Sequence, residues 1–212
     1  MTRITWGDAG QRFYEAGADR GVLYIGTDAG VPWNGLTSVR ENPSGGQPDP
    51  YYIDGFKYIN LAMAEEFEAT IEAFSSPAAF GVCDGTMSIA NGLFITQQRR
   101  QEFNLCYRTL LGNDADGLDH GYKLHLVYNA LAKPSDRDNQ TIGDSPEPTG
   151  LSWDITTAPP RLSGYRPTAH LVVDSRTTPA ELLQDLEDLL YGSSLGPATL
   201  PPQADLIALF TA

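Results

Sequence analysis

The chain has 212 residues, and 14 Lys and Arg against 27 Asp and Glu give it a net charge of −13. This length suits one well-cored domain, and the acidic balance argues against a protein that wraps a nucleic-acid backbone. The sequence has two cysteines without CxxC spacing, no secretory leader and no apolar run of the ~20 residues that cross a bilayer, so we expect a soluble protein from a reducing cytoplasm.

The first half of the chain has the pattern of short strands separated by turns. Residues 33–41 form a β-branched and aromatic run, which predicts a strand. Residues 42–50 are rich in Pro, Gly and Ser, which predicts a long loop. In residues 51–62, Asp54 and Gly55 separate two strand-like runs, so this segment predicts a hairpin.

Residues 65–74 fit two interpretations. Their Glu, Ala and Met content favours a helix by propensity. Their apolar residues alternate strictly with polar ones, which is the strand period. The apolar set is Phe67, Ala69, Ile71 and Ala73, and the polar set is Glu66, Glu68, Thr70 and Glu72.

The second half contains more alternating runs and one clear helix. Strands are expected around residues 103–109, 122–128, 151–155 and 168–174, with long loops at 112–121 and 133–150. Thr178, Pro179 and Glu181 have the spacing of a capping box at the start of a helix. Leucines then recur at helical spacing up to Leu190, so one face of the helix is expected to dock on a sheet, and Gly192 is expected to end it.

Residues 195–212 are predicted to be a C-terminal extension of the domain formed by residues 1–194. The segment combines three prolines with a terminal apolar cluster, and it suits either a frayed end or an extended arm. We favour the arm, because large apolar side chains are costly to leave in water. The cluster comprises Leu206, Ile207, Leu209 and Phe210.

Motifs of catalysis give no support for an enzyme: the sequence contains no HExxH or GxxxxGK[ST], and its GxSxG match at Gly192–Gly196 follows a predicted helix instead of the strand that a nucleophile elbow requires. The three histidines, at 120, 125 and 170, are isolated along the chain, and Cys83 and Cys106 suit buried, inert thiols. The aspartates of residues 114–119 lack the terminal Glu of an EF-hand and suit a solvated loop. We therefore expect no catalytic residue, no cofactor and no metal.

Several segments together resemble the major tail protein family, the tail-tube subunits of long-tailed, non-contractile bacteriophages. The likeness spans roughly residues 20–190 and lies in the order of its segments rather than in one diagnostic motif. These segments are Trp33-Asn34-Gly35-Leu36-Thr37, Pro43-Ser44-Gly45-Gly46, 65–74 followed by Pro77 and Cys83-Asp84-Gly85, Gly112-Asn113-Asp114, 120–124, and Asp144-Ser145-Pro146-Glu147 before Leu151-Ser152-Trp153.

This resemblance implies a mainly β, α+β fold of the tail-tube type: an antiparallel β-sandwich or barrel with one docked helix and long loops. It favours the strand over the helix for residues 65–74. It also implies a structural, non-enzymatic virion protein that is assembled in the host cytoplasm. Hexameric rings of this protein would stack into the tube that conducts DNA to the host, and its partners would be copies of itself and the tape-measure, tail-terminator and tail-tip proteins.

Two sets of residues gain expected roles from the resemblance. By themselves Glu66, Glu68 and Glu72 suit the solvent-facing side of an ordinary antiparallel sheet. With the resemblance they would line the lumen, where DNA would pass without specific binding, because carboxylates offer phosphates nothing to bind. The contacts between subunits would come from the two long loops and the C-terminal tip. The candidates are Pro43, Gly45, Gly46, Pro48, Leu206, Ile207, Leu209 and Phe210.

Two other function classes stay open from the sequence. One is a phage-encoded β-sandwich hydrolase. The other is a carbohydrate-binding module, for which Trp6, Trp33 and Trp153 would have to line an exposed platform. Trp153 alternates with Leu151 and Ile155 in a predicted strand, which favours a core position.

Overall fold

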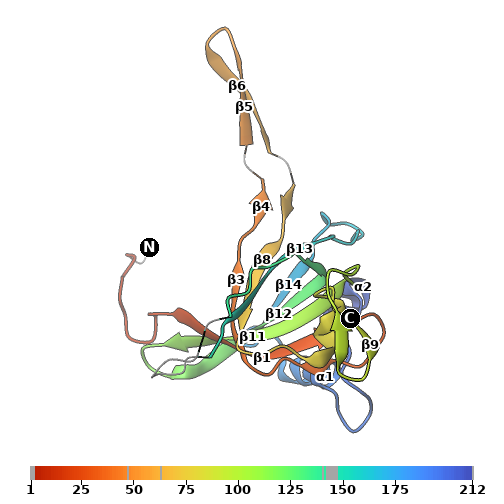
Figure 1. Ribbon diagram of the computed structural model, residues 1–212. Helices are drawn as coiled ribbons and strands as arrows, with labels where there is room; N and C mark the ends of the chain where they lie inside the picture. The colour runs from red at the N-terminus through yellow and green to blue at the C-terminus, as the bar shows by residue number, and fades with distance from the viewer. Residues whose placement is uncertain (1–2, 47, 63, 140, 142–147, 212) are drawn as a thin grey trace.

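The structure is a computed structural model that describes residues 3–46, 48–62, 64–139, 141 and 148–211. Its main body is an eight-stranded antiparallel sheet flanked by two helices, and a long arm extends from it (Figure 1). The mainly β, antiparallel class predicted from the sequence is confirmed, with a second helix that was not expected.

The strands are β1 (Tyr14–Tyr24), β2 (Val31–Pro32), β3 (Leu36–Glu41), β4 (Ser44–Gly45), β5 (Pro48–Ile53), β6 (Phe56–Ala62), β7 (Glu65–Glu66), β8 (Glu68–Ala73), β9 (Met87–Ala90), β10 (Leu93–Ile95), β11 (Phe103–Asn113), β12 (Gly117–Ala132), β13 (Leu151–Thr157) and β14 (His170–Asp174). The helices are α1 (Ala180–Tyr191), α2 (Gln203–Thr211) and a short 3-10 helix, η1 (Ala78–Val82).

The large sheet curls upon itself. Its strand order is β2-β1-β11-β12-β13-β8-β3, and β14 pairs with the middle of β12. Strands β1 and β3, far apart along this path, come close: a Cβ at Gly21 of β1 would lie 2.7 Å from the Leu36 side chain of β3, so glycine gives this approach its room. The Trp33 N–H donates to the Gly21 carbonyl at 2.8 Å and continues the pairing of β2 with β1.

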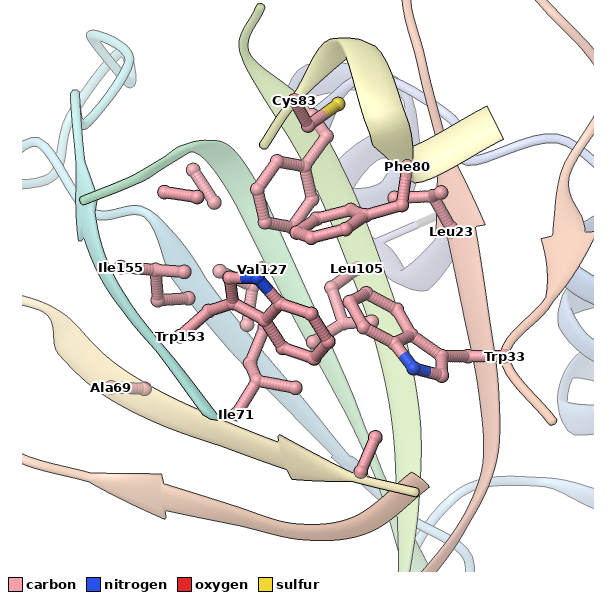
Figure 2. Close-up of a cluster of buried hydrophobic side chains, with 14 of the residues drawn as sticks. Leu23, Trp33, Ala69, Ile71, Phe80, Cys83, Leu105, Val127, Trp153 and Ile155 are labelled. Atoms are coloured by element: carbon pink, nitrogen blue, oxygen red, sulfur yellow. The ribbon is translucent and has the colours of Figure 1, made fainter. Parts of the chain in front are cut away.

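The curl encloses an aromatic core. Phe80 of η1 lies 4.7 Å from Trp33 and 5.1 Å from Trp153, measured between ring centroids, and all three rings are buried (Figure 2). Ile71 and Ile155 reach the same core from β8 and β13. The alternation predicted for residues 65–74 is confirmed, because Ala69, Ile71 and Ala73 are buried while Glu72 faces solvent.

A second core lies on the outer face of the sheet, beneath the helices. Leu186 and Leu190 of α1 and Leu206 of α2 pack there with Cys106 and Leu126 of the sheet. Docking of α1 is thus confirmed, and so is its end at Gly192, which has φ +81°. The central strands are buried on both faces, since Leu105 points to the inner core and Cys106 to the outer one.

The predicted capping box is wrong. The residue before the first turn of α1 is Pro179, and no side chain caps the helix. The Thr178 hydroxyl donates instead to the Asp174 carbonyl at 2.9 Å, because the chain makes a tight turn between β14 and α1. The start of this helix therefore relies on the packing of its apolar face rather than on a side-chain cap.

Two predicted loops are also corrected. Residues 42–50, apart from Gln47, which lies outside the described residues, contain β4 and the start of β5 rather than a continuous loop. The loop at 112–121 shrinks to Asp114–Asp116, because β11 and β12 extend almost to the turn. The described part of 133–150 has no helix or strand, and residues 140 and 142–147, with part of the Asp144–Glu147 motif, lie outside the described residues. The domain limit at residue 194 remains a prediction.

Candidate assembly surface

A long arm is the most exposed part of the molecule. We define the arm as residues 42–67; it leaves the sheet after β3 and returns to it at β8 (Figure 1). The β4–β7 pair forms its base and the β5–β6 hairpin its tip. At the tip, Asp54 and Gly55 have φ of +52° and +79°, as the predicted two-residue turn requires.

The tip carries large apolar side chains that nothing in the chain covers, among the residues that the structure describes. Phe56 is 79% exposed and Tyr58 is 73% exposed. The others are Tyr51, Tyr52, Ile53, Ile59 and Leu61. A two-stranded hairpin of this kind is marginally stable in water by itself, and its open edges invite pairing with other strands.

Apolar side chains occupy both faces of this hairpin. Ile53 pairs with Phe56, and Tyr51 pairs with Ile59, on the other side of a register shift between Tyr51 and Tyr52. Directly opposed residues point to the same face of a sheet, and alternate residues along a strand share a face. Phe56 and Ile59 therefore share the face of Ile53 and Tyr51, while Tyr52, opposite Lys57, lies on the other face, so the tip exposes apolar side chains on two sides.

Two further exposed apolar segments lie elsewhere, and sequence reasoning missed them. The β9–β10 hairpin exposes Ile89 and Phe94 by 56% and 60%, and the N-terminal segment exposes Trp6 by 83%. Asp114 anchors that N-terminal segment by accepting hydrogen bonds from the Gly10 and Arg12 amides. The alternation of β9 and β10 is too short to predict strands, so no pattern in the sequence indicated this hairpin.

The chain exposes more surface to solvent than a compact monomer of the same mass would. Its solvent-accessible area is 14225 Å². A compact monomer of 23.0 kDa exposes about 9,600 Å² by the usual scaling with mass, so the excess is about 4,600 Å². This excess is of the size that obligate interfaces bury.

The predicted acidic residues lie on one solvent-facing surface at and near the base of the arm. Glu72 accepts a hydrogen bond from Ser38 at 2.8 Å, and Glu66 is exposed on β7. Glu68 accepts from Lys133 at 2.8 Å and from Ser44 at 2.9 Å, and these two donors hold the pKa of its carboxyl below the usual range. Glu68 is therefore partly neutralised, whereas Glu66 and Glu72 keep their charge toward solvent.

The predicted contact residues separate into two places. Pro43, Gly45, Gly46 and Pro48 all belong to the arm, where Gly45 is required because a Cβ would lie 2.7 Å from the Ala64 carbonyl oxygen. The C-terminal tip differs from the extended arm that we expected. It forms α2, in which Leu206 is buried against the same chain, while Ile207 and Leu209 are half-buried and Phe210 is 38% exposed. A short helix buries this apolar cluster locally, so no distant partner is needed for Leu206.

The histidines are not isolated, which corrects the sequence interpretation. His125 Nδ1 and His170 Nε2 lie 3.1 Å apart, and Glu41 Oε1 lies 3.5 Å from His125 Nδ1. Burial lowers the pKa of both imidazoles. The three residues are tens of positions apart in the sequence, so their spacing could not indicate that they form a cluster. His120, by contrast, bonds to Asp116 in the β11–β12 turn.

The cysteines and tryptophans lie mostly in the cores. Cys83 and Cys106 are free and buried, and burial raises the pKa of each thiol to about 12, so the prediction of inert thiols is confirmed. Trp33 and Trp153 are buried in the aromatic core, and Trp6 is exposed elsewhere. The three tryptophans therefore do not form a common platform. None of the helices in the described part of the chain has the length and hydropathy to span a bilayer.

Comparison with known proteins gives structural matches only. No protein-family model and no curated protein sequence matches the chain. Among solved structures, it is similar to a component of the sheath–tube complex of an extracellular contractile injection system (PVC) in its extended state, with 14% identity, a TM-score of 0.35, and coverage of 73% of this chain and 88% of the other.

Two further matches come from related particles. One is from the sheath/tube terminator of the same kind of system, with 12% identity, a TM-score of 0.37, and coverage of 81% and 99% of the two chains. The other is from the tube-terminating cap of the anti-feeding prophage, with 10% identity, a TM-score of 0.34, and coverage of 82% and 97%. Two of the three come from an extracellular contractile injection system and the third from the anti-feeding prophage, whereas the expectation from the sequence was a non-contractile phage tail.

Proposed function

We propose that this chain is the structural subunit of a phage-type tail tube, which polymerises as stacked, hexameric rings and conducts DNA to the host. The observation that carries the proposal is the arm, whose apolar tip is exposed on both faces. Burial of one large apolar side chain contributes about 1.5–3 kcal/mol, so a tip with seven of them is strongly favoured to associate. A non-enzymatic role in an extracellular virion or injection particle follows from the same reading.

A tube requires two kinds of contact between identical subunits. A closed ring uses heterologous contacts around its axis, and stacking needs a second, open-ended contact along it. The molecule offers separate exposed apolar surfaces for these two tasks: the tip of the arm, and the β9–β10 hairpin with the N-terminal segment. We assign the arm to the contact with a neighbouring ring, because it reaches farthest from the sheet (Figure 1).

We assign the surface of β7 and β8 that bears Glu66, Glu68 and Glu72 to the lumen. In the described part of the chain no helix covers this face, since α1 and α2 pack on the part of the sheet formed by β1, β11, β12 and β14. A duplex carries one negative charge per ~1.7 Å, so an acidic wall lets it slide without binding. At physiological salt only charges within ~8 Å act on the passing DNA, so the local charge of this face matters more than the net charge.

Oligomeric state tests the proposed function. Purified protein, studied by light scattering after size exclusion and by negative-stain microscopy, is expected to form rings and tubes of uniform width with a central channel. A protein that stays monomeric at high concentration would contradict the proposal. Turnover of a cell-wall polysaccharide by that monomer would favour the hydrolase, and retention on the polysaccharide would favour the binding module.

Charge reversal tests the lumen assignment. We expect Glu66→Lys with Glu72→Lys to leave assembly intact and to slow DNA ejection several-fold, because the new ammonium groups bind phosphate. Ejection is measured as dye-labelled DNA released from particles reconstituted with the variant. The matched control is Glu181→Lys with Asp185→Lys, which makes the same change of net charge on the exposed side of α1. Equal ejection rates for the two variants would place the acidic face outside the lumen.

A further inference from the structure

Two histidines and a glutamate converge at the base of the arm. His125 lies on β12, His170 begins β14, and Glu41 ends β3, where the arm leaves the sheet. One ligand atom from each residue lies within 4.8 Å of those of the other two. His125 is buried, His170 is half-buried and Glu41 is exposed, so the cluster opens to solvent on the Glu41 side.

Hydrogen bonds determine the tautomer of His125, and so which of its ring nitrogens has a free lone pair. Thr109 has one hydroxyl proton, and it donates this proton to Glu15 Oε1 at 2.5 Å. The Thr109 oxygen, 3.0 Å from His125 Nε2, must then accept a proton from that nitrogen. His125 is therefore protonated on Nε2, and Nδ1 presents its lone pair toward His170 and Glu41.

Surrounding groups hold the other members in place. The Tyr107 hydroxyl donates to Glu41 Oε1 at 2.8 Å, and the Tyr107 ring stacks on His125 at 4.5 Å with an interplanar angle of 7°. Phe67 packs on the His170 ring at 4.4 Å. Outer contacts of this kind, which orient imidazole and carboxylate groups, are typical of metal centres.

The separations of the ligand atoms match those around a small metal ion. Two ligands bound tetrahedrally at about 2.0–2.1 Å from Zn²⁺ lie about 3.3–3.4 Å apart. The observed separations are 3.1 Å between the two imidazole nitrogens and 3.5 Å between His125 Nδ1 and Glu41 Oε1. The exposed Glu41 side chain can adjust to close the remaining pair.

We propose that Glu41, His125 and His170 bind a divalent transition metal ion, with Zn²⁺ as the best fit. Two imidazoles and one carboxylate form a three-ligand set that zinc accepts, and a fourth position stays open to solvent. The ion would join the end of β3, and so the base of the arm, to β12 and β14. It would thereby stabilise the direction in which the arm leaves the sheet.

Metal titration of the full-length protein tests this proposal. After removal of metals with EDTA, the protein is titrated with Zn²⁺ by calorimetry and with Co²⁺, whose visible spectrum reports tetrahedral coordination. We expect one ion per chain and a higher thermal unfolding temperature with Zn²⁺. His170→Gln is expected to weaken binding at least tenfold, and Thr109→Val, which removes the group that orients His125, to weaken it about 10–100-fold.

The third histidine supplies the matched control. His120→Gln changes a histidine outside the cluster and should leave the affinity unchanged. Should His170→Gln fail to fold, Glu41→Gln decides, since its exposed carboxylate is removed without a change in size and binding should again fall at least tenfold. Absence of stoichiometric binding in the unmodified protein would overturn the proposal. So would Glu41 and His170 variants that bind the metal as tightly as the unmodified protein does.

Discussion

Replacement of Phe56 and Tyr58 by serine is expected to leave a folded protein that no longer assembles. Both side chains lie at the tip of the arm, 79% and 73% exposed, so their loss removes nothing from the two cores. If each contributes about 1.5–3 kcal/mol to a contact between subunits, the double variant weakens that contact by about a hundred to ten thousand fold. Every ring repeats this loss at each subunit, so tubes should disappear.

Sedimentation velocity over a range of concentrations measures this effect, with circular dichroism to show that the fold is kept. Leu195→Ser provides the control, because Leu195 is 94% exposed in the turn after α1, far from the arm in the sequence. The control should assemble like the unmodified protein. If both variants assemble normally, the tip does not carry the contact; if both fail, exposed apolar surface in general drives association and the arm has no special role.

The elements that could be predicted from the sequence are those with one buried face and one face in solvent. Residues 65–74 have buried alanines and Ile71 on one side and carboxylates on the other, so alternation indicated the inward face of β8, while the choice of strand over helix came from the family resemblance. β13 was found in the same way through Trp153 and Ile155. The α1 leucines could be assigned because they form one stripe on a helix that docks by a single face.

Proline misled the prediction for residues 42–50. Pro48 and Pro50 oppose Ala62 and Asn60 in the β5–β6 hairpin. A hairpin of two strands has an unpaired side on each strand, where a missing N–H costs nothing, so proline is tolerated there. The composition of the segment indicates correctly that it does not belong to a sheet interior. It cannot distinguish an open loop from an isolated ribbon.

The histidine cluster could not have been found from the sequence. Glu41, His125 and His170 meet because β12 pairs with β14 and the curl of the sheet brings the end of β3 beside them. No local spacing links the three positions, and each is an ordinary strand residue by itself. The assembly surface was predicted only in part, for a related reason. Exposed aromatic residues at the tip of the arm have the same sequence pattern as buried ones, and only the fold shows that no other part of the described chain covers them.

Trp153→Ala is expected to cost about 3–5 kcal/mol of the free energy of unfolding, a large part of the roughly 5–15 kcal/mol that a domain possesses. Trp153 is 1% exposed and its ring meets those of Trp33 and Phe80, so truncation opens a cavity that these two rings cannot fill. Trp6→Ala removes the same side chain from a site that is 83% exposed and should change stability by less than about 0.5 kcal/mol.

Urea unfolding followed by far-ultraviolet circular dichroism measures both values, since it does not depend on tryptophan fluorescence. The measurement belongs in the Phe56→Ser, Tyr58→Ser background, because self-association would otherwise add its own free energy to that of folding. Equal effects of the two tryptophan substitutions would contradict the arrangement of the inner core. A large effect of Trp6→Ala on assembly, with none on unfolding, would instead assign the N-terminal segment to the contact between neighbours in a ring.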